Sequence, residues 1–255
     1  MDETPGRPYP TVMEFSDEAF VLSARAHGET GAIVELLTRD HGKYAAHVAG
    51  GASRRIKPFL QGGARVLVDY RARTADHLGS AVLEPVGEGP AALFDDRLAL
   101  AGLSSAAAVA AQALPEREAH PAVFDALEAL IMALAHPEIW PAVYIRFELG
   151  LLQELGFGLD LTKCAATGAV DDLVFVSPRT GRAVSRVAGE PYRDKLLPLP
   201  PFLLGAQAGL RPGEIGQGLD LTGHFLDAFV FSALHKPLPP SRVWMLDRLR
   251  EQQRL

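Results

Sequence analysis

The stretch Glu29-Thr30-Gly31-Ala32-Ile33-Val34-Glu35-Leu36-Leu37-Thr38-Arg39-Asp40 decides the fold of the N-terminal part of the chain. Its apolar part, residues 33–38, lies between turn residues on both sides, which is the pattern of a β-strand. A second strand pattern, residues 43–48, follows at once. The turn between the two contains Gly42, which can take the positive φ angle that a tight turn needs. The sequence therefore predicts a β-hairpin here.

Three more strand patterns flank this hairpin, at residues 18–25, 64–73 and 78–85. Between them, Pro58 argues against a continuing central strand, so we expect a loop after residue 49. Residues alternate between the two faces of a strand, and one face of strand 64–73 is expected to carry Arg65, Leu67, Asp69, Arg71 and Arg73. Five short strands at this spacing predict an OB-fold barrel, in which strands 2 and 3 commonly form the oligonucleotide-binding face.

The same region is basic, although the whole chain has a formal net charge of -6. Residues 29–73 contain eight Lys and Arg residues against four Asp and Glu residues. Clustered cations bind phosphate backbones because counterions are released on contact, so we predict that the barrel holds single-stranded nucleic acid. The predicted nucleic-acid-binding residues are Arg39, Lys43, Tyr44, Arg54, Arg55, Lys57, Arg65, Arg71 and Arg73.

Four rings in this region are candidates to stack on unpaired bases: Tyr44, His47, Phe59 and Tyr70. Phe59 and Tyr70 fit a buried position better, whereas Tyr44 follows Lys43 near a turn and is the preferred stacking residue. For each of the cations, an ordinary solvated strand face remains the alternative interpretation.

The pattern changes from strands to helices after Gly87-Glu88-Gly89-Pro90. Apolar residues then recur at three- and four-residue spacing, which is typical of amphipathic helices. The predicted helices span residues 95–113, 120–136, 138–155, 214–235 and 241–254. We therefore expect an α+β multidomain chain with a disordered leader over residues 1–14, an OB-fold domain over 15–88 and a helical domain over 89–255.

A small β-hairpin insert is expected at about residues 160–199 of the helical domain, formed by residues 173–177 and 182–186. The segment that begins at Cys164 has the outline of a zinc ribbon, which needs four Cys or His ligands in two close pairs. Position 167 is Thr, and residues 169–199 contain neither Cys nor His. We therefore expect that the zinc ligands are lost, that the insert has no cofactor, and that apolar packing holds it together.

Several functional classes find no support in the sequence. There is no Gly-x-x-x-x-Gly-Lys-Ser/Thr phosphate loop and no Gly-x-Ser-x-Gly motif, so no enzyme is expected. The single cysteine, Cys164, excludes an intramolecular disulfide. The acidic, Pro-rich start has no signal-peptide pattern, and the apolar runs fall short of the roughly 20 residues that cross a bilayer. We expect a cytoplasmic protein without a membrane segment.

Five stretches carry a resemblance to a known family. They are Gly28-Glu29, Ile33-Val34-Glu35-Leu36-Leu37-Thr38, Gly42-Lys43, Arg54-Arg55-Ile56-Lys57-Pro58-Phe59-Leu60-Gln61 and Glu154-Leu155-Gly156-Phe157-Gly158-Leu159-Asp160-Leu161. The last stretch is the most specific, and the likeness covers the chain from about residue 15 to residue 235. On these motifs the chain resembles the bacterial recombination mediator family RecO.

The resemblance implies an N-terminal OB fold followed by a helical domain with a zinc-finger-like insert. It also implies a role in DNA repair and homologous recombination, with binding of single- and double-stranded DNA and annealing of complementary strands without ATP. The implied partners are single-stranded DNA, RecR, the C-terminal tail of single-stranded-DNA-binding protein and, indirectly, the RecA recombinase that is loaded onto DNA. The sequence departs from the four-cysteine members of the family, so the resemblance implies no zinc here.

A protein-binding adaptor with little direct DNA affinity is the alternative function. The last predicted helix mixes cations with apolar residues, a combination that suits an acidic peptide with an apolar end. The residues of this mixture are Arg242, Trp244, Met245, Leu246, Arg248, Leu249, Arg250 and Arg254. For Trp244 and Leu246, packing of an amphipathic helix on its own domain remains the other interpretation.

The missing ligands predict that the purified protein contains no stoichiometric zinc, because one thiol cannot replace a four-ligand site. Metal analysis by atomic emission on protein prepared without chelators checks this. About one zinc ion per chain would contradict it.

Overall fold

The computed structural model describes residues 13–54, 56–74, 77–87, 96–205 and 210–252. Most of the predicted leader, Arg55 and the predicted helix start at Asp95 lie outside these residues. The chain divides into two compact units, one formed by Met1–Pro90 with Glu116–Ala119 and the other by Ala91–Pro115 with His120–Leu255. Within the described ranges, no helix is long and apolar enough to cross a membrane.

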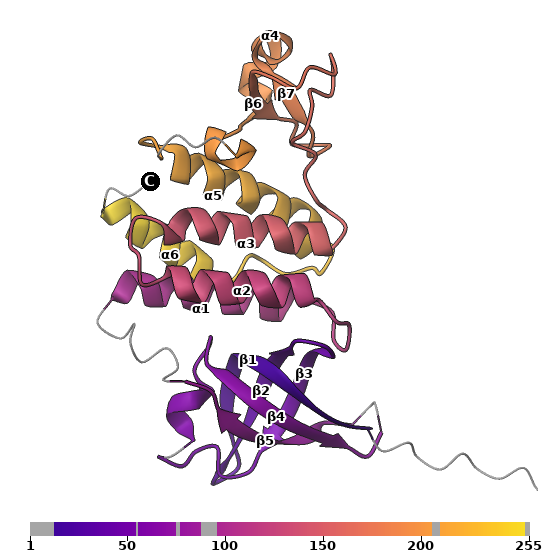
Figure 1. Ribbon diagram of the computed structural model, residues 1–255, viewed down its shortest axis with the longest axis vertical. Helices are drawn as coiled ribbons and strands as arrows, with labels where there is room; N and C mark the ends of the chain where they lie inside the picture. The colour runs from indigo at the N-terminus through magenta and orange to yellow at the C-terminus, as the bar shows by residue number, and fades with distance from the viewer. Residues whose placement is uncertain (1–12, 55, 75–76, 88–95, 206–209, 253–255) are drawn as a thin grey trace, which may run out of the picture. The chain divides into compact units, whose positions relative to one another are not determined.

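The first unit is a closed five-stranded barrel (Figure 1), as the sequence predicts. Its strands are β1 (Met13–His27), β2 (Gly31–Thr38), β3 (Gly42–Val48), β4 (Arg65–Ala72) and β5 (Gly79–Pro85), and their order around the barrel is β1-β2-β3-β5-β4. β1 begins earlier than predicted. It pairs with β4 through its first half and with β2 through its second half, and a register irregularity near its middle marks the change of partner.

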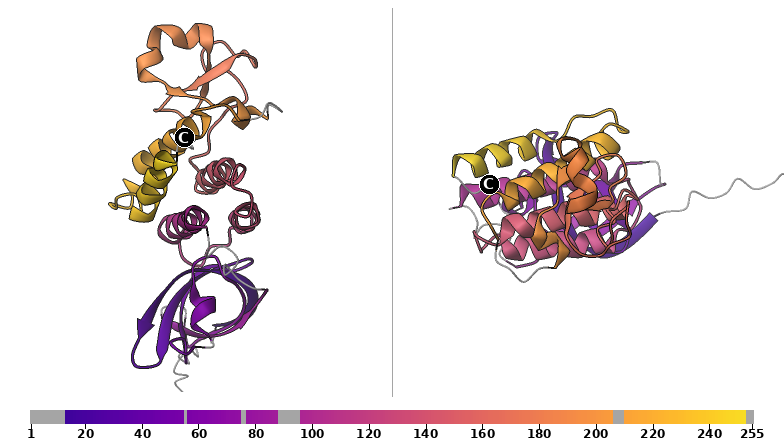
Figure 2. Two further views of the ribbon diagram at one scale, coloured as in Figure 1. Left: turned by 90° about the vertical axis from the view of Figure 1, so that its left-hand side faces the viewer. Right: turned by 90° about the horizontal axis from the view of Figure 1, so that it is seen from above.

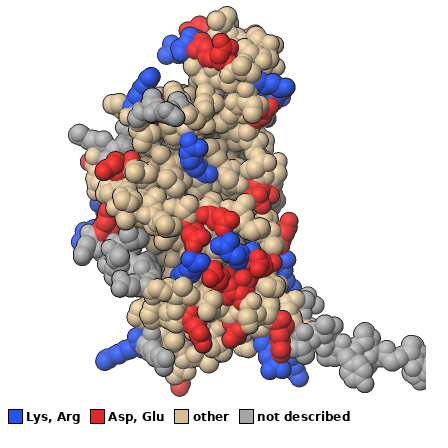
Figure 3. Space-filling view, in the orientation of Figure 1, with Lys and Arg blue, Asp and Glu red and all other residues tan. Residues whose placement is uncertain are grey.

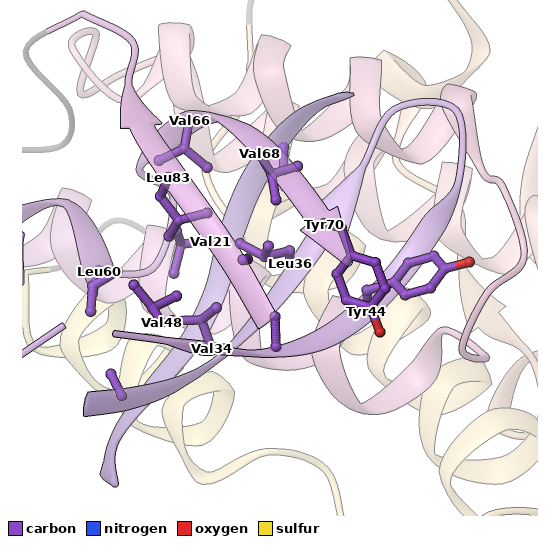
Figure 4. Close-up of a cluster of buried hydrophobic side chains, with 14 of the residues drawn as sticks. Val21, Val34, Leu36, Tyr44, Val48, Leu60, Val66, Val68, Tyr70 and Leu83 are labelled. Atoms are coloured by element: carbon purple, nitrogen blue, oxygen red, sulfur yellow. The ribbon is translucent and has the colours of Figure 1, made fainter. Parts of the chain in front are cut away.

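Alternation of side chains fills the barrel with apolar groups (Figure 4). Val34, Val66 and Leu36 are fully buried, and the rings of Tyr44 and Tyr70 meet edge to face at 4.9 Å. Figure 2 shows the strands curling round this closed interior. A short 3-10 turn, η1 (Lys57–Leu60), places Leu60 against the same core. The core therefore fixes which face of every strand points outward.

The second unit is mainly helical, which confirms the predicted α+β class. Its helices are α1 (Arg97–Ala113), α2 (Pro121–Ala133), α3 (Trp140–Glu154), α5 (Glu214–Phe225) and α6 (Pro240–Glu251). The Asp96 carboxylate caps α1 by accepting hydrogen bonds from the backbone N–H groups of Leu98 and Ala99. The predicted helix at 214–235 is α-helical only to Phe225 and continues as a π-helical segment, η5 (Leu226–Phe231).

A buried ion pair joins three of these helices. Arg242 of α6 donates from Nε to Oε1 of Glu148 at 2.7 Å and from Nη2 to Oε2 at 2.9 Å. Thr222 of α5 donates to the same carboxylate at 2.5 Å, and Glu148 and Arg242 are only 0% and 4% exposed. Burial and the nearby Glu148 carboxylate raise the pKa of Tyr144 well above its ordinary value. These partners offset the cost of burying the Glu148 and Arg242 charges.

The insert is a three-stranded sheet in the order β7-β6-β8, formed by β6 (Leu173–Val176), β7 (Ala183–Ser185) and β8 (Leu197–Pro198). The predicted hairpin is present. The two-residue strand β8 was not predicted, since it is too short to show a period. Three short helical segments lie after the hairpin: α4 (Arg186–Gly189), η3 (Glu190–Lys195) and η4 (Pro201–Leu204).

Cys164 anchors this insert by hydrogen bonds. Its thiol is buried and accepts bonds from the backbone N–H of Ser185 at 3.3 Å and from the Ser185 hydroxyl at 3.4 Å. Desolvation alone would raise the pKa of the thiol, but the hydrogen bonds from Ser185, with further ones from Thr167, lower the pKa to about 6. Thr167 and Ser185 thus surround the thiol with hydrogen-bond donors.

Replacing Arg242 by Ala is expected to lower the free energy of unfolding by about 3–5 kcal/mol, because the Glu148 carboxylate is left buried without its partner. Denaturant titration followed by circular dichroism measures the loss. Arg250→Ala is the matched control, since its ion pair with Asp247 is exposed, and should change stability by less than about 0.5 kcal/mol. An Arg242→Ala loss no larger than this control would contradict the argument.

The Cys164 thiolate is expected to titrate with a midpoint near pH 6, and Ser185→Ala should raise that midpoint because one donor to sulfur is removed. Thiolate ultraviolet absorbance reports this residue alone, since the chain contains one cysteine. Ser232→Ala, at an exposed position of the same unit but outside the insert, should leave the midpoint unchanged. Identical midpoints in all three proteins would show that Ser185 does not hold the thiolate.

Candidate nucleic-acid interface

One row of residues on the outer face of the barrel crosses all five strands, and its β2 member, Ile33, is buried. Residues opposite each other in a ladder lie on the same face, so the register places them side by side. Successive partners are Arg25 of β1, Ile33 of β2, His47 of β3, Ser80 of β5, Arg71 of β4 and Glu14 at the start of β1. We call these six residues the cross-strand row. From Arg25 to Arg71 it spans four steps of about 4.8 Å, roughly 20 Å in all.

His47 stands at the centre of this row. Its ring lies over Gly31, where a Cβ atom would come within 2.4 Å of Nε2, so a side chain at position 31 would displace the imidazole. His27 contacts it edge to face, with ring centroids 5.7 Å apart. The half-buried imidazole therefore presents one aromatic surface between the two ends of the row.

Each end of the row is extended by a loop with exposed cations. At the Arg25 end, the loop after β3 crosses the β1–β2 turn, where the Ala52 N–H donates to the Thr30 carbonyl at 3.0 Å, and it carries exposed Arg54 and Lys57. At the Arg71 end, β4 runs into the β4–β5 loop, which carries Arg73 and His77. An OB fold commonly binds oligonucleotides with its β1–β2 and β4–β5 loops and across strands 2 and 3.

Two hollows adjoin at the β3–β5 seam and share His47, Arg71 and Ser80 as a common wall. The first, of about 460 Å³, is lined further by Ala72, Arg73, His77, Leu78 and Gly79 and is called the cationic hollow. The second, of about 650 Å³, is lined further by Glu14, Phe15, Ser16, Ala49, Asp69, Tyr70, Ala81 and Val82 and is called the acidic hollow. The seam is therefore indented on both sides of the row.

Three of the predicted cations are paired with carboxylates of β1. Glu18 accepts from Arg65 at 2.6 Å and lies 4.0 Å from Arg39, and Glu14 lies 2.6 Å from Arg71. Figure 3 shows acidic and basic side chains intermixed over the lower half of the face in view. Exposed pairs of this kind are worth about 0–1 kcal/mol, so a phosphate can compete for Arg71, whose side chain is 71% exposed.

Two predicted residues do not reach the surface. Lys43 is 8% exposed, and its backbone carbonyl accepts a hydrogen bond from the Arg117 N–H at 2.9 Å. Tyr44 is 6% exposed and packs edge to face against Phe15 and Tyr70 in the barrel core. Neither side chain is therefore placed to contact nucleic acid, and the prediction of Tyr44 as the stacking ring is corrected here.

Sequence reasoning missed three side chains of this surface: Arg25, His77 and Ser80. Arg25 lies in a predicted strand but before the basic stretch of residues 29–73. Strand patterns also do not predict which residues of neighbouring strands face each other. His77 is held by a hydrogen bond to Thr74 at 2.6 Å. Arg25 could have been found from its position, three residues before Gly28 and at the end of the strand that precedes the basic hairpin.

Among the described residues, no group of three or more His, Cys, Asp or Glu side chains could hold a metal ion. The lone buried thiol of Cys164 is occupied by hydrogen-bond donors. The described surface of the barrel thus offers charge, hydroxyl and imidazole groups for binding.

Comparison with known proteins identifies the family. The family described as "Recombination protein O N terminal" matches residues 13–84, and "Recombination protein O C terminal" matches residues 95–237. The chain is 74% identical to the DNA repair protein RecO of Phenylobacterium zucineum over 95% of this chain and 100% of the relative, and 74% identical to that of Caulobacter vibrioides with the same coverage. The DNA repair protein RecO of Rhodospirillum centenum is 54% identical over 94% of this chain and 96% of the relative. The chain therefore belongs to the RecO family of DNA repair proteins.

Proposed function

We propose that this chain is a recombination mediator that binds single-stranded DNA across the outer face of its barrel. In this role it anneals complementary strands without ATP and helps to load the RecA recombinase onto DNA coated with single-stranded-DNA-binding protein. The observation that supports the proposal most is the cross-strand row, whose ladder register continues from the β1–β2 turn to the β4–β5 loop, the two loops that an OB fold uses for binding.

The row supplies the two kinds of contact that a single strand needs. Arg25, Arg71 and Arg73, with Arg54 and Lys57 in the loop, neutralise phosphates along the path. The His47 imidazole offers a face for an unpaired base, and stacking of this kind tolerates any sequence. Carboxylates beside the arginines limit the affinity. Because the contacts with phosphates are electrostatic, binding weakens as the ionic strength of the solution rises.

Annealing follows from charge neutralisation and requires no catalytic group. Two complementary strands repel each other through their phosphates, and cations held against one strand reduce this repulsion when the second strand approaches. The bases remain free to pair wherever the protein contacts only the backbone. We therefore propose a mediator that lowers an electrostatic barrier and is not an enzyme.

RecR and the acidic tail of single-stranded-DNA-binding protein are the proposed protein partners. Helix α6 offers fewer groups for the tail than its sequence suggests, because Arg242, Met245, Leu246 and Leu249 are buried and Arg254 lies beyond the described residues. Trp244 is 46% exposed, and the guanidinium of Arg248 lies 5.1 Å from its ring centroid. This cation–π pair on α6 supports the adaptor as the second candidate function.

Charge reversal at Arg54, Arg55 and Lys57 together is expected to weaken binding of single-stranded DNA at least tenfold and to reduce the slope of log K against log salt by about 2, as expected for three lost phosphate contacts. Fluorescence anisotropy over a salt series measures both quantities. The control variant reverses Arg179, Arg193 and Lys195, three exposed cations of the insert, and changes the net charge equally.

Equal weakening in both variants would indicate a net-charge effect and not a barrel site. Unchanged affinity in the barrel variant would remove the loop from the interface. Annealing of complementary oligonucleotides without nucleotide separates the two candidate functions, because an adaptor with little DNA affinity would not accelerate it.

A further inference from the structure

The two hollows at the β3–β5 seam differ in charge although they share a wall. The cationic hollow contains Arg71, Arg73, His47 and His77, and no Asp or Glu is among the described residues that line it. The acidic hollow contains the carboxylates of Glu14 and Asp69, and Arg71 is the only Lys or Arg among the described residues that line it. A strand that follows the row therefore has opposite electrostatic environments on its two sides.

A nucleotide has two parts that suit these two environments. Its phosphate is attracted by Arg71 and Arg73 and repelled by Glu14 and Asp69, so the cationic hollow is where the phosphate is stabilised. A nucleobase is uncharged and carries hydrogen-bond donors on its edge, for which a carboxylate is a strong acceptor. A hollow of about 650 Å³ has room for one unstacked base.

The β1–β4 ladder holds the acceptors of the acidic hollow in place. Ser16 and Asp69 are direct partners in the ladder, and the Ser16 hydroxyl donates to Oδ1 of Asp69. A carboxylate has about four lone-pair sites on its two oxygens, so Asp69 keeps capacity for a donor from a ligand. Glu14 is oriented by Arg71 at 2.6 Å. Val82, 64% exposed, gives the hollow an apolar side.

We propose that the acidic hollow is a nucleobase subsite in which Asp69 accepts a hydrogen bond from an exocyclic amino group, so that cytosine is preferred to thymine and uracil. The amino group of cytosine offers two N–H donors at the base edge. Thymine and uracil offer one N–H, flanked by two carbonyl oxygens that the carboxylate repels. This inference rests on the proposed binding of single-stranded DNA at the barrel.

The test compares oligodeoxycytidine, oligodeoxyuridine and oligothymidine of equal length by fluorescence anisotropy at neutral pH and fixed salt. Cytosine strands are expected to bind about three- to tenfold more tightly, the contribution of one partly solvated hydrogen bond, and the other two should be equal. Strands of N4,N4-dimethylcytosine, which lack the amino N–H groups, should bind the unmodified protein only as well as thymine strands do.

Asp69→Asn should abolish the preference, because an amide can also donate to the thymine carbonyl. Glu84→Gln is the matched control, since Glu84 is an exposed carboxylate of β5 that does not line the acidic hollow, and it should keep the preference. The dimethylcytosine strands do not depend on how either variant folds.

Equal affinity of the unmodified protein for all strands, or a preference that survives in Asp69→Asn, overturns the nucleobase subsite and leaves the proposed function in place. A failure to bind any strand at low salt overturns the proposed function as well. A preference lost with dimethylcytosine and with Asp69→Asn, but kept with Glu84→Gln, supports the subsite.

Discussion

The closure of the barrel between β3 and β5 is the constraint on which the described interface depends. Only two residue pairs, Ala46 with Gly79 and His47 with Ser80, join these parallel strands. Gly79 is required there, because a Cβ atom at this position would lie 2.2 Å from the Tyr70 ring. Without this short seam the sheet would be open, with His47 on one edge strand, β3, and Arg71 on β4, next to the other edge strand, β5. The seam makes one surface of them and leaves a hollow on either side.

The acidic side chains of β1 reduce the positive charge of this surface. β1 contacts both β2 and β4, so its carboxylates at Glu14 and Glu18 reach the arginines of neighbouring strands. A surface of cations alone would hold a strand tightly and release it slowly. Because Arg39, Arg65 and Arg71 already have exposed partners of low energy, in the proposed function a phosphate exchanges one weak pair for another, and the bound strand stays exchangeable.

Much of the fold could be predicted because the hydrophobic repeats of strands (two residues) and helices (3.6 residues) are visible within short stretches of sequence. The alternation of residues 64–73 placed Val66, Val68 and Tyr70 on one face, and these residues are buried. What depends on distant parts of the chain was not predicted. Lys43 is buried at a β3 edge that pairs with Glu116, more than seventy residues later in the sequence. β8 consists of two residues, and the π-helical segment at Leu226 has the same apolar spacing as an α-helix.

The candidate site was harder to predict than the fold. A site consists of residues that are neighbours in space, whereas sequence patterns identify residues one at a time. The excess of basic residues in the sequence pointed to Arg71 and Arg73. It did not predict that Glu14 pairs with Arg71 or that Arg25 lies in the same row. Both facts follow from register, which the strand patterns left undetermined at β1 because this strand changes partner at its midpoint. A mediator of the proposed kind needs affinity for any sequence, and in the proposal the arginines of the row and its loops supply it by contacting phosphates. The proposed base preference is confined to one hollow, where it adds to binding without controlling it.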